Sequence, residues 1–217
     1  MRQWAGLDRY LCNQTRFAFR RHYRVAPWSD CIELHWGPKC QIYVTPVDAN
    51  EICVALVSQD SHLRLDAVLT AFPELASRLR DAEQVSIERG AISSTRKLLQ
   101  VYKGRVALVG DASGTVDAIT GEGLCLAFRQ AQVLAECFAL GDLQRYQREH
   151  RSLARRPFLM ARLMLALDWK NLRQRVMRAF DADPRLFERM LAMHVGAPSP
   201  ADFAANGLAL GWQMLRA

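Results

Sequence analysis

The sequence predicts an α+β protein in which an antiparallel sheet is followed by one further strand and a C-terminal helical region. Apolar and polar residues alternate through the first sixty positions, turn residues separate these runs, and helical spacing takes over after about residue 100. Half of the 217 residues are hydrophobic, which is typical of a packed globular chain. We expect three parts: a substrate-binding-like sheet domain with helices (1–100), a strand and helix (101–140) and a helical region (141–217).

The first part reads as a meander. Four segments alternate or are rich in β-branched and aromatic residues, as strands with one buried face are; they are 16–25, 31–36, 41–47 and 51–57. Gly37-Pro38 and Asp48-Ala49-Asn50 lie between successive segments and are typical of hairpin turns. In residues 62–80 the apolar residues recur at helical spacing. Pro73 interrupts this pattern and suits the first turn of a second short helix.

Two further strands complete the expected sheet-forming segments. The first is VSIERGAI, residues 85–92. The second is Val106–Val109, a short continuous apolar run of the kind found in strands that are covered on both faces, as in parallel sheets.

The remaining chain is predicted to be helical. From Gly121 to about Leu140 the apolar residues recur at helical spacing, namely Leu124, Ala127, Phe128, Ala131, Leu134, Ala135 and Phe138. Gly141 ends this helix and Asp142 can cap the next, which is basic up to Pro157 and strongly apolar after it. We expect helices over 168–180 and 183–194, then a loop and a short terminal helix.

Composition narrows the function classes. The net charge of +7 comes from 25 arginines against four lysines, but the arginines are spread out and no aromatic interleaving accompanies them, so we expect no nucleic-acid partner. The apolar stretch 158–169 is typical of a helix that packs into a core. Contact with a membrane surface is the lesser alternative. The six cysteines and five histidines lack metal-ligand spacing, so we assign no metal. No segment has signal-peptide or membrane-span character, which predicts a cytoplasmic protein with reduced, mostly buried cysteines.

The stretch 105–128, RVALVGDASGTVDAITGEGLCLAF, carries the chemistry. Gly110 and Asp111 fall where a buried strand ends, and a carboxylate there accepts hydrogen bonds from sugar-like hydroxyls. Ala112 opens a loop of small residues that leaves room for a flat ligand. Thr120 precedes Gly121-Glu122-Gly123, where a helix begins with exposed N–H groups that favour negative charge.

These residues resemble a known motif. Gly110-Asp111-Ala112-Ser113-Gly114 followed by Thr120-Gly121-Glu122-Gly123 is similar to the second flavin-binding motif of the FAD-dependent oxidoreductases of the para-hydroxybenzoate hydroxylase and geranylgeranyl reductase superfamily. The resemblance implies that Asp111 binds the ribityl chain of FAD and that Gly121–Gly123 lie by the pyrimidine side of the isoalloxazine. It also implies a partial α/β FAD-binding fold, with cofactor contacts from Gly110, Asp111, Ala112, Thr120, Gly121, Glu122 and Gly123. Catalytic residues are not identified.

Three departures qualify the resemblance. Ala118 stands where the family usually has proline, and Gly114 stands where many aromatic hydroxylases have histidine. The glycine favours the reductase-like branch of the family. The sequence contains no Gly-x-Gly-x-x-Gly between a first strand and helix, the feature that seats a dinucleotide pyrophosphate. The start MRQWAGLDR resembles the residues that come after the family's Asp-Gly motif. We therefore expect a C-terminal portion of a longer protein, missing the N-terminal dinucleotide-binding half and prone to aggregate alone.

Two functions of different classes are compatible with these residues. The first is a FAD-dependent reductase or monooxygenase, or part of one, that acts on an apolar or aromatic small molecule with NAD(P)H as the electron donor. The second is a degenerate, non-catalytic fragment that serves as a binding or interaction module. A basic nucleic-acid binder is a third and weaker hypothesis.

Overall fold

The computed structural model describes residues 2–196 and 199–216 of the 217-residue chain. The chain divides into two compact units, residues 1–158 and 159–217. The first unit holds all the described strands and the helices up to most of α4, and the second holds helices. The three domain ranges expected from the sequence stay a prediction.

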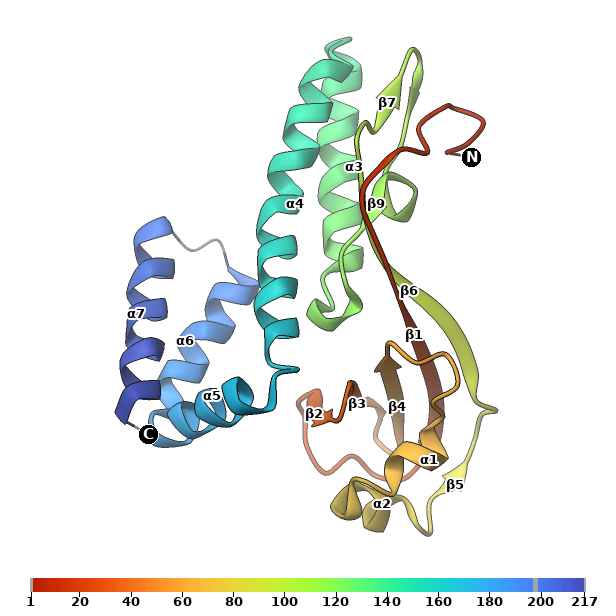
Figure 1. Cartoon of the computed structure of the whole chain (residues 1–217). Helices are drawn as coiled ribbons and strands as arrows, with labels where there is room; N and C mark the ends of the chain where they lie inside the picture. The colour runs from red at the N-terminus through yellow and green to blue at the C-terminus, as the bar shows by residue number, and fades with distance from the viewer. Residues whose placement is uncertain (1, 197–198, 217) are drawn as a thin grey trace. The chain divides into compact units, whose positions relative to one another are not determined.

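The first unit contains a curled antiparallel sheet (Figure 1). Its strands follow the order β2-β3-β4-β1-β6-β9, and β5 pairs with β1. A separate two-stranded hairpin is formed by β7 and β8. The strands are β1 (Tyr10–Arg24), β2 (Glu33–Gly37), β3 (Cys40–Asp48), β4 (Glu51–Ser58), β5 (Glu83–Gln84), β6 (Arg89–Leu98), β7 (Tyr102–Lys103), β8 (Val106–Ala107) and β9 (Gly114–Thr115).

The predicted meander is confirmed for β2, β3 and β4, but β1 pairs with β4 instead of with β2. Each of its four segments overlaps a strand, and the two predicted turns join β2 to β3 and β3 to β4. The next strand was predicted over 85–92 but begins later, since β6 covers Arg89–Leu98. Its last residues include the buried Ser94 and Thr95, whose polarity hid them from a search for apolar alternation.

One face of the sheet is covered by two short helices, α1 (Leu65–Leu69) and α2 (Pro73–Leu79). Their buried leucines and Val68 pack on the alternate residues of the central strands, with Ile42, Val54 and Leu56 fully buried. Pro73 is the first residue of α2, as the sequence predicts. This core accounts for the strict alternation of the strands, because only one face of the sheet is covered here.

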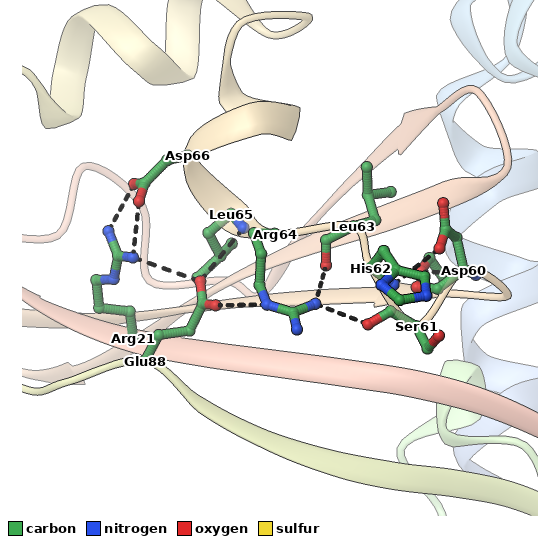
Figure 2. A network of polar contacts seen from close by, with 10 residues as sticks. Arg21, Asp60, Ser61, His62, Leu63, Arg64, Leu65, Asp66 and Glu88 are labelled. Carbon is green, nitrogen blue, oxygen red and sulfur yellow. Dashed lines mark hydrogen bonds and ion pairs between the residues drawn. The ribbon is translucent and has the colours of Figure 1, made fainter.

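An ion-pair network fastens α1 to the sheet (Figure 2). The guanidinium of Arg21 in β1 donates to both carboxylate oxygens of Asp66, at 2.7 and 3.0 Å. Glu88 lies 3.4 Å from Arg21 and 3.7 Å from Arg64, and its carboxylate also accepts from the backbone N–H of Leu65. Asp66 and Glu88 therefore neutralise the charges of Arg21 and Arg64.

The apolar run Val106–Val109 differs from its prediction. Only Val106 and Ala107 form a strand, β8, and it pairs antiparallel with β7 instead of joining a parallel sheet. Gly104 has φ +57° and allows the tight turn between the two strands. The apolar character of the run instead reflects the burial of Leu108, whose N–H donates to Val101 O.

The remaining elements are helical. The 3₁₀ turns η1 (Gly110–Ser113) and η2 (Ala118–Thr120) precede five helices: α3 (Gly123–Ala139), α4 (Leu143–Ala166), α5 (Lys170–Ala182), α6 (Pro184–Val195) and α7 (Pro200–Arg216). The helices expected over 168–180 and 183–194 are confirmed as α5 and α6. Pro157 lies inside α4, and α7 is a full-length helix rather than a short one. None of the helices in the described ranges is long and apolar enough to span a membrane.

Helix α3 turns its apolar stripe outward. Leu124, Phe128 and Phe138 are more than 70% exposed, whereas Leu126, Gln130 and Cys137 are buried. The predicted periodicity is present, but the face that it defines has no cover in the described part of the chain. Such a surface agrees with the expected tendency to aggregate.

The cysteines are free but mostly not buried. Cys40 and Cys137 are buried, Cys12 and Cys53 are partly buried, and Cys31 and Cys125 are exposed. The expectation that most cysteines are buried is therefore wrong. Cys31 lies in a loop, and Cys125 lies on the uncovered side of α3.

Candidate functional site

The predicted flavin-binding residues lie on two short turns around the start of α3. The first turn is η1, whose opening residue Gly110 has φ +58°. Asp111 follows and is exposed, and no hydrogen bond or ion pair of its carboxylate is found within residues 2–196 and 199–216. Its backbone oxygen accepts from the Arg2 guanidinium at 3.0 Å. Asp111 therefore presents an unengaged carboxylate on a fixed backbone.

Buried polar side chains hold η1 from behind. The amide oxygen Oε1 of Gln130 in α3 accepts from the N–H of Gly110 at 2.9 Å and lies 3.1 Å from Ser113 Oγ. Nε2 of His150 in α4 lies 2.8 Å from the same hydroxyl. The Ser113 proton has two acceptors in reach, Gly110 O and Gln130 Oε1, which leaves the hydroxyl oxygen to accept from Nε2–H of a neutral His150.

Tyr146 supports the chain just before η1. This fully buried residue of α4 donates its hydroxyl proton to Leu108 O at 2.7 Å, and its ring meets that of His150 edge-on at 5.8 Å. Burial raises the pKa of the Tyr146 hydroxyl, so it stays a donor. Burial, with a smaller effect of the Arg151 charge, lowers the pKa of His150 to about 4, so its imidazole is neutral at pH 7.

The loop that leaves η1 is fixed to the edge of the sheet. Gly114 in β9 pairs with Lys97 of β6 and has φ +126°, and a Cβ placed there would lie 2.7 Å from Arg96 O. The adjacent Thr115 hydroxyl donates to Ser94 O. A histidine at position 114 does not fit this close approach of backbone to backbone, which gives the glycine a local structural reason.

A buried ion pair then ties the loop to the middle of the sheet. Nη1 of Arg16 in β1 lies 2.8 Å from Oδ1 of Asp117, and the two side chains are only 6% and 4% exposed. The same carboxylate oxygen accepts from the N–H of Ile119 and so caps η2. The Tyr43 hydroxyl in β3 donates to Ile119 O at 3.2 Å. These contacts fix the path of residues 114–121 before α3 begins.

The second turn carries the other predicted residues. Thr120 is buried and its hydroxyl donates to Asp117 O, while Gly121 is exposed with φ +66°. Glu122 is the N-cap of α3, and its carboxylate lies 3.5 Å from Nη2 of Arg156 in α4. Gly123 opens α3 in open space, since a Cβ there would meet nothing within 4 Å.

The two turns meet on the N-terminal half of α3. A Cβ on Gly110 would lie 3.4 Å from Cβ of Ala127, which stands one helical turn after Gly123. Gly110, Asp111 and the partly buried Ala112 therefore belong to the same small region as the first residues of the helix. Sequence reasoning missed the residues that build this region from inside, namely Arg16, Asp117, Gln130, Tyr146 and His150. A glutamine within the apolar period of α3 is the one signal that the sequence offers for them.

No group of acidic, cysteine or histidine side chains suited to a metal ion occurs within the described ranges. The region instead offers a carboxylate that has no partner in those ranges, a small-residue loop and the amide-rich start of a 17-residue helix. This set can accept hydrogen bonds from hydroxyls and place backbone donors against a group with negative charge.

Comparisons with known proteins agree on the fold. No family model and no curated protein matches the sequence. Among solved structures, a flavoprotein/dehydrogenase from Cytophaga hutchinsonii superposes over 91% of this chain and 53% of its own, with a TM-score of 0.71 and 18% identity. A geranylgeranyl bacteriochlorophyll reductase-like protein from Thermoplasma acidophilum superposes over 74% of this chain and 46% of its own, with a TM-score of 0.57 and 22% identity.

Halogenases share the fold as well. A myxobacterial FAD-dependent chondrochloren halogenase superposes over 70% of this chain and 40% of its own, with a TM-score of 0.57 and 19% identity. The chain thus spans about half the length of these proteins and has a partial FAD-binding-type fold. The predicted resemblance to FAD-dependent oxidoreductases is confirmed at the level of fold.

Proposed function

We propose that this chain, folded like about half of a FAD-dependent oxidoreductase, binds the ribityl and isoalloxazine parts of a flavin between Asp111 and the start of α3. The Asp111 carboxylate would accept hydrogen bonds from the ribityl hydroxyls. Gly121, Glu122 and Gly123 would lie by the pyrimidine side of the ring, and the N–H of Gly123 would face it, because the N–H groups of Gly121 and Glu122 already donate to Ala118 O and Thr120 Oγ1. Gly110 and Ala112 keep the loop small enough for the cofactor to approach, and Thr120 holds η2 in place below it.

Two features that the fold itself does not require support this proposal, one at Asp111 and one at Gly123. Asp111 is exposed with a carboxylate that engages nothing in the described ranges, although its backbone is fixed by Gln130 and His150 from within. Gly123 has neither a positive φ nor a neighbour within 4 Å, so the fold would accept a side chain there. Close approach of a ligand to the backbone gives a reason for a glycine at this place.

The chemistry divides between the cofactor and the chain. A bound flavin supplies the redox chemistry, and protein groups bind it, orient it and limit the access of water. In this chain Asp111 would hold the sugar-like chain, and the positive end of the α3 dipole would favour negative charge on the ring. The Glu122–Arg156 pair neutralises the acidic side chain that would otherwise oppose that charge.

The reaction that we propose is reduction or hydroxylation of an apolar or aromatic small molecule, with NAD(P)H as the electron donor. Gly114 favours the reductase branch, because the histidine of many aromatic hydroxylases does not fit beside Arg96 O. The sequence has no Gly-x-Gly-x-x-Gly for the pyrophosphate, so the dinucleotide-binding half would come from other sequence. We place the protein in the cytoplasm, a reducing compartment that suits six free cysteines.

The second candidate function is a non-catalytic binding or interaction module. The outward apolar stripe of α3 favours it, since an uncovered stripe suits contact with another protein surface. Flavin binding separates the two functions, because an interaction module that has lost the cofactor gains no flavin.

The substitution Asp111→Asn tests the proposal. We expect the wild-type chain to quench the fluorescence of added riboflavin and FAD, and the variant to bind both at least about tenfold more weakly, because hydrogen bonds to a charged group contribute about 1.5–3 kcal/mol. Asp81→Asn removes another exposed carboxylate as a matched control and leaves binding unchanged. Equal binding by the wild type and Asp111→Asn, or no binding by the wild type, would contradict the proposal.

A further inference from the structure

We propose that the outward face of α7 is an interface through which two copies of this chain associate, with their α7 helices antiparallel. The inference goes beyond the proposed function and does not depend on flavin binding. It rests on the spacing of exposed apolar residues along α7, on the order of large and small side chains in that spacing, and on a glycine that one copy of the chain does not require.

Helix α7 has one packed face and one exposed face. It contacts α5 and α6, and Figure 1 shows it alongside α6. Its partly buried residues, among them Phe203, Asn206 and Leu210, mark the packed face. The side-chain amide of Asn206 donates to Met193 Sδ in α6 at 3.4 Å. The opposite face of α7 has no cover in the described part of the chain.

The exposed face carries residues at the spacing of a seam between two helices. Ala204, Leu208, Gly211 and Leu215 follow one another at intervals of four, three and four residues, which is the pattern of helices that pack side by side. All four residues are exposed, and the two leucines are each 76% exposed. Leucines in such a row are typical of a helix that packs against a further helix.

The order of large and small residues makes this seam complementary to itself. When a second α7 runs in the opposite direction, Leu208 lies opposite Gly211 of the second copy and Leu215 lies opposite Ala204 of the second copy. The same two contacts recur in reverse, as the two-fold symmetry of a homodimer requires. In a parallel pair each small residue would face a small residue and leave a gap. The seam therefore favours the antiparallel pair.

Gly211 supports the same arrangement independently. A glycine inside a helix costs stability relative to alanine. Gly211 has no positive φ, and a Cβ there would meet nothing within 4 Å, so one copy of the chain gives no reason for it. Close packing of Leu208 from a second copy against the backbone does give a reason.

The residues beside the seam also suit an antiparallel pair. Trp212 is 56% exposed, and the Arg216 guanidinium lies 4.4 Å from the centre of its ring. An antiparallel second copy brings its own Ala205, a small residue, to this tryptophan. Asp202 and Arg216 are the two charged residues of α7 and stand at opposite ends of it. The acidic end of each helix therefore meets the basic end of the other.

A membrane surface is the alternative occupant of this face. A helix that binds anionic lipid carries several lysines or arginines beside its apolar face, whereas α7 has a single arginine. Ala204 and Gly211 also offer little apolar surface for insertion between lipids. These features favour a second copy of the chain.

Sedimentation equilibrium of the full chain at a series of concentrations tests the inference. The seam covers Ala204–Leu215, about 16 Å of helix, so we expect a dimer that dissociates on dilution, with a mass that rises from 24.6 kDa toward twice that value. Leu208→Glu/Leu215→Glu should raise the dimer dissociation constant at least about a hundredfold, because both copies lose buried leucines. The control Phe128→Glu/Phe138→Glu makes the same kind of change on the exposed stripe of α3 and should leave the constant unchanged.

Gly211→Leu tests the antiparallel register. It adds apolar surface, yet it should raise the dissociation constant at least about tenfold, because two leucines then meet where one fits. The exchange Leu208→Gly/Gly211→Leu returns one large and one small residue to each contact and should recover most of the lost affinity. A side chain at position 211 has room in a single copy, so this test holds even if the double glutamate variant fails to fold.

Three outcomes would overturn the inference. The wild-type chain could stay at 24.6 kDa at every concentration, and binding to vesicles of anionic phospholipid would then assign the face to a membrane instead. The double glutamate variant of α7 could associate as the wild type does, or Gly211→Leu could associate more tightly than the wild type. None of these measurements involves flavin, so they leave the proposed function to its own test.

Discussion

Breaking the buried pair between Arg16 and Asp117 will cost about 3–5 kcal/mol of folding free energy, because it leaves one buried charge without its partner. We expect this loss in both Arg16→Met and Asp117→Leu, measured by urea denaturation. The double variant should lose less than the sum of the two single losses, since it leaves neither charge behind. The pair joins β1 to the loop before α3, so its loss should also weaken flavin binding.

The control for this cycle is the exposed pair of Arg24 and Glu83, whose side chains are 62% and 65% exposed. Solvent screens such pairs, and we expect Arg24→Met and Glu83→Leu to change the free energy of unfolding by less than about 1 kcal/mol each. If the two pairs behave alike, Arg16 and Asp117 do not anchor the loop as described.

Acidification will destabilise the chain through His150. Its pKa is about 4 in the folded protein against an ordinary value of 6.5, so the unfolded chain binds more protons between these two pH values. Stability is therefore full above pH 6.5 and falls as the pH drops toward 4, by about 3 kcal/mol from this residue. Below pH 4 both states are protonated and this contribution stays constant.

Comparison of His150→Gln with the wild type isolates the effect, because a glutamine can still donate to Ser113 but does not titrate. We expect the variant to lose about 3 kcal/mol of the pH dependence between pH 7 and pH 4 in urea denaturation curves. His62→Gln makes the same substitution at an exposed histidine and serves as the matched control. Identical pH profiles for His150→Gln and the wild type would refute the burial of a neutral imidazole behind η1.

The sequence predicted best those elements whose periodicity depends on one covered face. The strands of the meander alternate because α1 and α2 bury Ile42, Val54 and Leu56, and Pro73 marks the start of α2. Prediction was poorest for strands whose position depends on which other strand they pair with. The run at 106–109 is apolar enough for a parallel sheet, but the described chain contains no strand to run alongside it, so β8 pairs with β7.

In the site as well, local features could be predicted from the sequence and long-range contacts could not. The local motif from Gly110 to Gly123 was visible in the sequence because its residue types lie close together along the chain. The side chains that hold it were not visible, because Arg16 lies 101 residues from Asp117 and His150 lies 37 residues from Ser113. Contacts over such separations leave no local pattern. The uncovered stripe of α3 was predicted as a periodicity, but whether it is covered depends on surfaces outside α3.

The central claim is that a flavin lies between Asp111 and the first residues of α3. Hydrogen exchange measured by mass spectrometry, with and without riboflavin, tests it most directly. We predict slower exchange on binding in two separate peptides, one covering 108–114 and one covering 120–126, and less slowing in both for Asp111→Asn at the same riboflavin concentration. Protection of neither peptide by bound riboflavin, or protection confined to α5–α7, would contradict the claim.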